Sequence, residues 1–170
     1  MRFLLLACLV LLAACGGDQA AKLNLGDPAP AFRTERLGGG SVDFPAAAGK
    51  PLVIRFWADW CKYCEPEMKA IEVVYQRHKG KGLEVPAVNA GQDKPAVAAF
   101  IIKLGVTYPV LLDEQSAIAK RYGVVGLPTT YFVDAKGGVR GKVIGEADEA
   151  VLEPAARASR RCAPGTAPAT

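Results

Sequence analysis

Apolar residues recur along the chain with two spacings, one typical of strands and one typical of helices. Leu52–Trp57 is an almost continuous apolar run, which predicts a strand buried on both faces of a sheet. Helical spacing then predicts a helix from about residue 61 to residue 78, in which Pro66 either kinks the helix or makes its first turn irregular. The residues that share one side of this helix are Met68, Ile71, Val74 and Tyr75.

The same two spacings continue to the C-terminus. A helical repeat predicts a second helix from about Lys94, and a last helix is expected to open at Asp148, with Pro154 as a point where it can break. The remaining predicted elements are strands over 83–89 and 110–112, a short helix over 116–122, and hairpins that pair 32–36 with 41–44 and 129–133 with 139–144. Strands that alternate with helices and end in a hairpin predict an α/β fold with helices on both faces of the sheet.

The N-terminus has the features of a targeting segment. Arg2 supplies a positive end, and Phe3–Leu12 is apolar but too short to span a bilayer as a helix. The following segment, Leu12-Ala13-Ala14-Cys15, resembles the lipobox of bacterial lipoproteins, which implies removal of residues 1–14 and lipidation of Cys15. The alternative is an ordinary secretory signal with an incidental cysteine. Either reading predicts an exported protein.

These features divide the chain into four parts. Residues 1–14 are the predicted signal peptide, and 15–25 are a polar tether that reaches about 35 Å at most. Residues 26–158 form the predicted domain, and 159–170 a flexible tail. About 155 residues remain after cleavage, which suits one globular domain. The net charge of +4 is small and the bases are interleaved with acids, so a nucleic-acid surface is not indicated.

Two of the five cysteines, Cys61 and Cys64, carry the main chemical signal. Side chains three residues apart on a helix lie roughly 5–6 Å apart, near enough to form a disulfide. Free N–H groups at a helix start, together with Lys62, lower the pKa of a thiol there. The pair therefore predicts exchange of electrons through sulfur. A static structural disulfide is the alternative, but so short a loop stabilises a fold little. No role is assigned to Cys162.

Several segments resemble one family. Phe56–Cys64 and Gly126–Thr130 look like the active-site motif and the cis-proline loop of the thioredoxin superfamily, and Gly26–Phe32 resembles the opening of its redoxin branch. Val88–Asp93 and Tyr108–Asp113 are similar to the central insertion of exported TlpA- and ResA-type thiol–disulfide oxidoreductases. The resemblance implies a thioredoxin-like fold, with a central mixed sheet flanked by helices, an N-terminal β-hairpin and a central insertion.

The resemblance also implies roles for the two cysteines. Cys61 is the exposed attacking sulfur, and Cys64 is the more buried sulfur that resolves the mixed disulfide. The redox-active disulfide then serves in place of a cofactor, and no metal is expected. Lys62-Tyr63 differs from the Gly-Pro of thioredoxin, which leaves the potential open between roughly −270 and −120 mV.

Further residues gain roles from the same likeness. Pro128 is expected to be cis, so that the backbone of Leu127 pairs with an incoming peptide. Glu67 matches a glutamate that manages the proton of the buried thiol, although a glutamate in a first helical turn is common for dipole reasons alone. Trp60 is expected to shield one side of the disulfide, while Trp57 is assigned to the core.

One residue departs from the thioredoxin pattern. Thioredoxin has a buried acid two residues before the first tryptophan of its motif, and this chain has Arg55 there. The proton-relay role of that acid therefore cannot be transferred. Arg55 is expected either to extend its charged end to solvent or to pair with an acid.

The leading hypothesis is an exported, membrane-tethered thiol–disulfide oxidoreductase that acts as a reductant. The expected partners are disulfide-bearing or dithiol proteins of the cell envelope, including those of cytochrome c maturation, and a membrane electron donor. A thiol peroxidase is one alternative, but Asp59-Trp60 stands where such enzymes place a threonine. Metal delivery is another, but His78 lies roughly 20 Å from the cysteine pair along the helix. The choice between inner and outer membrane stays open.

Overall fold

The computed structural model describes residues 22–44 and 50–161. The predicted signal peptide 1–14, the lipidation residue Cys15 and the tail residue Cys162 lie outside these ranges. In the described part, no helix has the length and apolar character needed to cross a bilayer.

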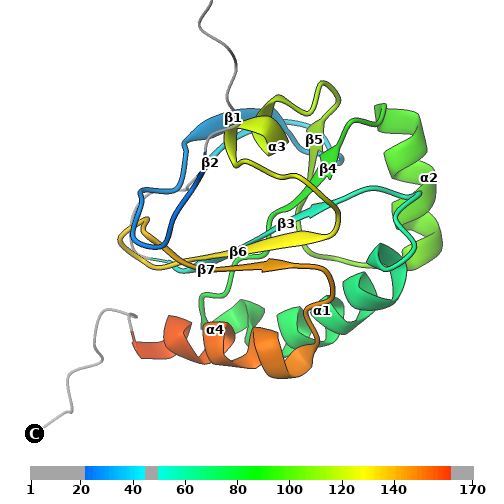
Figure 1. The fold of residues 1–170 in the computed structure, drawn as a ribbon. Coiled ribbons are helices and arrows are strands. Elements are labelled where there is room, and N and C mark those ends of the chain that lie inside the picture. Colours follow the sequence, from blue (N-terminus) through cyan, green and yellow to red (C-terminus); the bar gives the residue numbers. More distant parts are fainter. Residues whose placement is uncertain (1–21, 45–49, 162–170) are drawn as a thin grey trace, which may run out of the picture.

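The centre of the structure is a mixed five-stranded sheet in the order β5-β4-β3-β6-β7 (Figure 1). Strand β3 (Leu52–Trp57) is buried along its whole length, as its continuous apolar run predicts. Strands β4 (Ala87–Ala90) and β5 (Val110–Asp113) continue the sheet in parallel on one side of β3. The antiparallel strands β6 (Thr129–Val133) and β7 (Val139–Ile144) complete it on the other side.

Helices cover both faces of this sheet, as predicted. One core cluster joins Val53 and Trp57 of β3 to helices α1 (Cys64–His78), α2 (Lys94–Leu104) and α4 (Glu149–Arg161). The opposite cluster contains Ile54 and Phe56. The elements that pack on this second face are α3 (Ala117–Arg121) and the predicted N-terminal hairpin of β1 (Phe32–Glu35) and β2 (Ser41–Phe44).

Local hydrogen bonds explain several helix boundaries. Asp93 accepts a hydrogen bond from Ala96 N at 3.0 Å and so caps α2, while Asp148 does the same for Val151 N at 3.0 Å before α4. Helix α2 ends at Gly105, whose φ of 74° suits glycine best. Helix α4 runs through Pro154 without a break and extends three residues past the predicted domain end at 158.

Two predicted boundaries are wrong. The helix expected from residue 61 begins at Cys64, since residues 61–63 form a turn. Pro66 is therefore the third helical residue, where the backbone N–H has no acceptor within the helix and its loss costs little. The strand expected over 83–89 shortens to β4, because Pro86 has no N–H to donate to the sheet. The 3₁₀ turn η1 (Lys79–Lys81) follows α1.

Candidate active site

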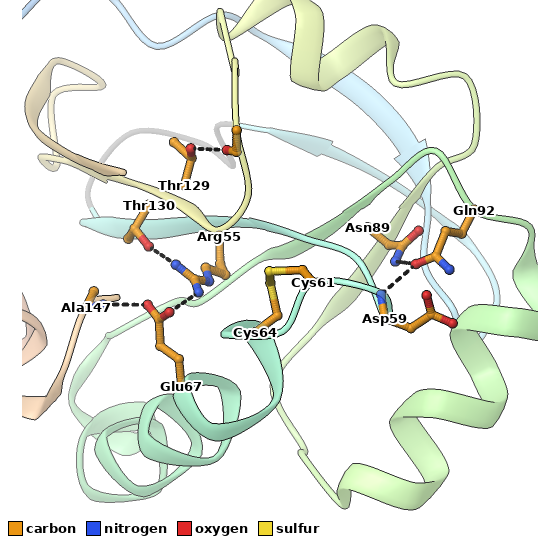
Figure 2. The surroundings of a disulfide bond; sticks show 11 residues. Arg55, Asp59, Cys61, Cys64, Glu67, Asn89, Gln92, Thr129, Thr130 and Ala147 are labelled. Carbon is orange, nitrogen blue, oxygen red and sulfur yellow. Dashed lines mark hydrogen bonds and ion pairs between the residues drawn. A yellow bond between two sulfur atoms is a disulfide. The ribbon is translucent and has the colours of Figure 1, made fainter. Parts of the chain in front are cut away.

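The sulfurs of Cys61 and Cys64 are joined in a disulfide where β3 leads into α1 (Figure 2). Their Cα atoms lie 5.3 Å apart, within the range that disulfides require. The turn between them is closed by a hydrogen bond from Cys64 N to Cys61 O at 2.9 Å, and the turn before them by one from Cys61 N to Ala58 O at 3.2 Å. The structure thus confirms the predicted pairing.

The exposure of the two sulfurs differs from the expectation in degree. Cys61 is 6% exposed and Cys64 is fully buried, so the predicted order is correct, but the expectation of an openly exposed first cysteine is wrong. In the oxidised state both cysteines pack into the core cluster beneath α1. Cys61 also precedes the helix by three residues instead of starting it. Tyr63, at the N-cap position, makes no side-chain capping bond, which leaves the first-turn N–H groups available to a sulfur.

The loop before β6 lies against the same cluster. The Leu127-Pro128 peptide bond is cis, as the resemblance implies. Leu127 is half-buried and packs against the cluster that contains both cysteines. Two hydrogen bonds hold this loop: Thr129 Oγ1 donates to Gly126 O at 2.6 Å, and Gly145 N donates to Pro128 O at 2.8 Å. Leu127 therefore joins the proline loop to the core cluster that contains both cysteines.

The two tryptophans near the site behave differently. Trp57 is fully buried and stacks on Phe100 with ring centroids 5.2 Å apart, which confirms its assignment to the core. Trp60 is 70% exposed, and its expected shielding of one side of the disulfide stays a prediction. Tyr63 and Val125 are also exposed apolar residues on the segments that flank the site. Such residues suit contact with another protein surface.

Two hydrogen bonds that the sequence did not predict hold the loop that precedes Cys61 in the chain. Gln92 Oε1 accepts hydrogen bonds from Asp59 N at 2.8 Å and from the buried Asn89 Nδ2 at 2.9 Å (Figure 2). Together they fasten the segment before Cys61 to the end of β4. The sequence offered one signal for this region, the similarity of Val88–Asp93 to an insertion of the family. That similarity did not predict the hydrogen bond between Gln92 and Asp59.

Arg55 pairs with an acid, which decides between the two expectations for it. Its side chain is fully buried and forms an ion pair with Glu67 Oε2. Arg55 NH1 also donates to Thr130 Oγ1 at 2.7 Å, and Ala147 N donates to Glu67 Oε1 at 2.8 Å (Figure 2). Burial raises the pKa of Glu67 above its ordinary value, while the charge of Arg55 opposes that rise. A buried carboxyl beside a thiol can take up and return a proton as the thiolate forms and is consumed.

His78 belongs to the far end of α1. It is buried, and its Nε2 lies 3.3 Å from Glu153. Across residues 22–44 and 50–161, no three histidine, cysteine or acidic side chains gather as a metal ion would need.

The fold and the site together define a thiol–disulfide oxidoreductase with a thioredoxin-like fold. The chain belongs to the AhpC/TSA family, whose sequence model matches residues 25–142.

Individual relatives agree with this assignment. The chain is 32% identical over 160 residues to the thiol-disulfide oxidoreductase ResA of Bacillus thuringiensis subsp. konkukian, covering 88% of this chain and 92% of the relative. A Chlorobium tepidum structure with the provisional name thiol:disulfide interchange protein DsbE has a TM-score of 0.75 and 28% identity, covering 81% of this chain and 99% of that one. A secreted Mycobacterium tuberculosis disulfide oxidoreductase homologous to E. coli DsbE has a TM-score of 0.67 and 25% identity, covering 75% and 95%.

Proposed function

We propose that this oxidoreductase is exported, is anchored to a membrane by a lipid on Cys15, and reduces disulfides in proteins of the cell envelope. The observation that carries the redox part is the Cys61–Cys64 disulfide at the amino end of α1, in the same core cluster against which Leu127 of the cis Leu127-Pro128 bond packs. Support for export comes from the leader-like N-terminus and from the likeness to a secreted mycobacterial oxidoreductase.

The reaction passes two electrons from the enzyme to its substrate. In the reduced enzyme, the Cys61 thiolate attacks one sulfur of a substrate disulfide, and the other substrate sulfur leaves as a thiolate. Cys64 then loses its proton and attacks the sulfur of Cys61. This step forms the Cys61–Cys64 disulfide, breaks the mixed disulfide and releases the second substrate thiolate. Both substrate thiolates take up protons, and a dithiol donor at the membrane returns the enzyme to its reduced form.

The residues around the sulfurs bind the substrate peptide and accept the proton of Cys64. The backbone of Leu127 pairs with the substrate peptide in the manner of an added strand. Trp60 offers an exposed apolar surface to the partner. Glu67 accepts the proton of Cys64 as its thiolate forms, since the two side chains lie one helical turn apart on α1.

The expected substrates are folded or unfolded proteins that carry a reducible disulfide, among them the CxxCH haem-attachment segments of c-type cytochromes. A membrane protein that supplies electrons is the expected second partner.

Cysteine variants test the redox part. The Cys61→Ser variant should lose reduction of a protein disulfide such as that of insulin and should form no covalent complex with it. The Cys64→Ser variant should instead trap a mixed disulfide that is visible on a non-reducing gel. Turnover that persists in Cys61→Ser would refute the mechanism. Peroxide consumption by the wild type at a comparable rate would favour a thiol peroxidase.

Substitution of Cys15 tests the anchor. In a bacterial host, the wild-type chain should sediment with membranes and take up labelled fatty acid, whereas Cys15→Ser should do neither. Cys162→Ser is the matched control, because it removes the other exported cysteine outside the pair and should leave membrane attachment unchanged. Equal lipid labelling of the wild type and Cys15→Ser would rule the anchor out.

A further inference from the structure

The central strand of the sheet carries a buried positive charge next to the active site. Residues alternate between the two faces of a strand, and Val53 and Trp57 of β3 pack in the same cluster as Cys61 and Cys64. Arg55 lies between them in this alternation, and its side chain is 0% exposed. A guanidinium cannot shed its charge in a protein, so its burial beneath α1 calls for partners.

The partners of Arg55 come from both sides of the active site. Glu67 lies on α1, one turn after Cys64, and Thr130 lies on β6, two residues after Pro128. Arg55 thereby joins the helix of the resolving cysteine to the strand that follows the proline loop (Figure 2). The second oxygen of Glu67 is held by Ala147 N, just before α4.

We propose that Arg55 is a positioning residue for the proton of Cys64: its ion pair with Glu67 keeps that carboxylate charged and in place to receive the proton. The proposal rests on the role proposed above for Glu67. Because Cys64 is fully buried, bulk water cannot readily take its proton. When the proton passes to Glu67, directly or through one water, the negative charge moves from the carboxylate to the Cys64 sulfur. The guanidinium stays beside Glu67 and offsets the negative charge in both states.

Other ionisable groups near Glu67 do not replace Arg55. Tyr108 donates its hydroxyl to Met68 O at 3.2 Å, and burial raises its pKa far above neutral, so it stays uncharged. Glu146, before α4, is acidic and raises the pKa of Glu67 instead of lowering it. Among the groups that act on the Glu67 pKa in the described residues, Arg55 is the one positive charge.

The test follows the second chemical step across pH. The rate at which Cys64 resolves a preformed mixed disulfide on Cys61 is measured for wild type, Arg55→Met, Glu67→Gln and the double variant. In Arg55→Met, the apparent pKa of this step should rise by one unit or more, so the resolution rate should fall about tenfold or more at pH values below the wild-type apparent pKa. Glu67→Gln should lose a similar amount, and the double variant should lose no more than either single variant. Attack by Cys61, measured in a Cys64→Ser background, should stay within about twofold of wild type with or without Arg55→Met.

Two further variants separate positioning from support of the fold. Thr130→Val removes the other hydrogen bond of Arg55 and keeps the ion pair, so its pH profile should match that of wild type. Arg55→Lys keeps the charge but not the forked geometry, so it should shift the profile by less than Arg55→Met. Arg55→Gln, which removes the charge but keeps a polar side chain, serves if Arg55→Met does not fold.

The outcomes distinguish the two claims. A pH profile of resolution in Arg55→Met, or failing that in Arg55→Gln, that coincides with wild type would overturn the role of Arg55, even if the melting temperature falls. If Glu67→Gln shifts the profile while the Arg55 variants do not, only the inference about Arg55 fails. If Glu67→Gln leaves the profile unchanged, the proposed role of Glu67 fails as well. A wild type that does not reduce protein disulfides would remove the proposed function itself.

Discussion

An ion pair between an arginine and a glutamate lies at each end of helix α1, and the two pairs differ in their access to water. Near the disulfide, the side chains of Arg55 and Glu67 are 0% and 3% exposed. At the far end, Arg77 contacts Glu153 at 3.4 Å with side chains that are 52% and 22% exposed. The residue types are the same, but the surroundings are not.

The two ion pairs differ in the desolvation free energy that the fold must offset. Exposed pairs such as Arg77–Glu153 are screened by solvent and salt, and they contribute little to stability. Burial of Arg55 and Glu67 removes both groups from water, and an apolar pair of similar size could fill the space with equal or greater stability. A buried ion pair beside a redox-active disulfide is therefore better explained by the chemistry of the site than by stability.

The largest expected effect comes from removal of one partner of the buried pair. Arg55→Met leaves Glu67 as an uncompensated carboxyl in the core, so the oxidised protein should lose about 3–5 kcal/mol of unfolding free energy. Arg77→Met is the matched control at the exposed end of α1 and should change stability little. Urea denaturation of both variants, with the disulfide intact, measures the contrast.

A double variant sharpens this result. In Arg55→Met/Glu67→Met no buried charge is left unpaired, so most of the stability lost by Arg55→Met should return. An equal loss in the single and double variants would mean that the packing of the Arg55 side chain matters more than its charge.

Much of the fold could be predicted from the sequence. A strand buried on both faces has a continuous apolar run, and a helix buried on one side has apolar residues at helical spacing. The sequence therefore predicts β3 and the start of α2 closely. The start of α1 could not be placed as well. Residues 61–63 form a turn that continues into the helix, and periodicity does not separate such a turn from a first helical turn.

The site could be predicted in part. The Cys61–Cys64 pair lies within four residues, so local sequence was sufficient to recognise it. The ion pair between Arg55 and Glu67 depends on how α1 lies across β3, which no local pattern encodes. The contact of Gln92 with Asp59 has the same origin, since it joins residues 33 positions apart.

The smallest expected effect is in the pH dependence of stability, and it compares the two ends of α1 most directly. The contributions of Glu67 and Glu153 to the free energy of unfolding should change with pH in opposite directions. At the buried end, desolvation raises the pKa of Glu67 above 4.5 although Arg55 opposes it. A carboxyl with a raised pKa in the folded state binds its proton more tightly there than in the unfolded chain. The contribution of Glu67 to the free energy of unfolding should therefore fall as pH rises from about 4.5 toward the raised pKa.

At the exposed end the sign reverses. Hydrogen bonding to His78, with further contributions from Arg77 and Arg157, lowers the pKa of Glu153 below 4.5. The contribution of Glu153 to the free energy of unfolding is present above its pKa in the unfolded chain. It is lost as pH falls through the lower pKa of the folded state. The stability of wild type relative to Glu67→Gln should thus decrease with rising pH, while that relative to Glu153→Gln should increase and level off above about pH 5. Urea titrations at several pH values measure both differences, and slopes of the same sign would show that burial of Glu67 does not dominate its ionisation.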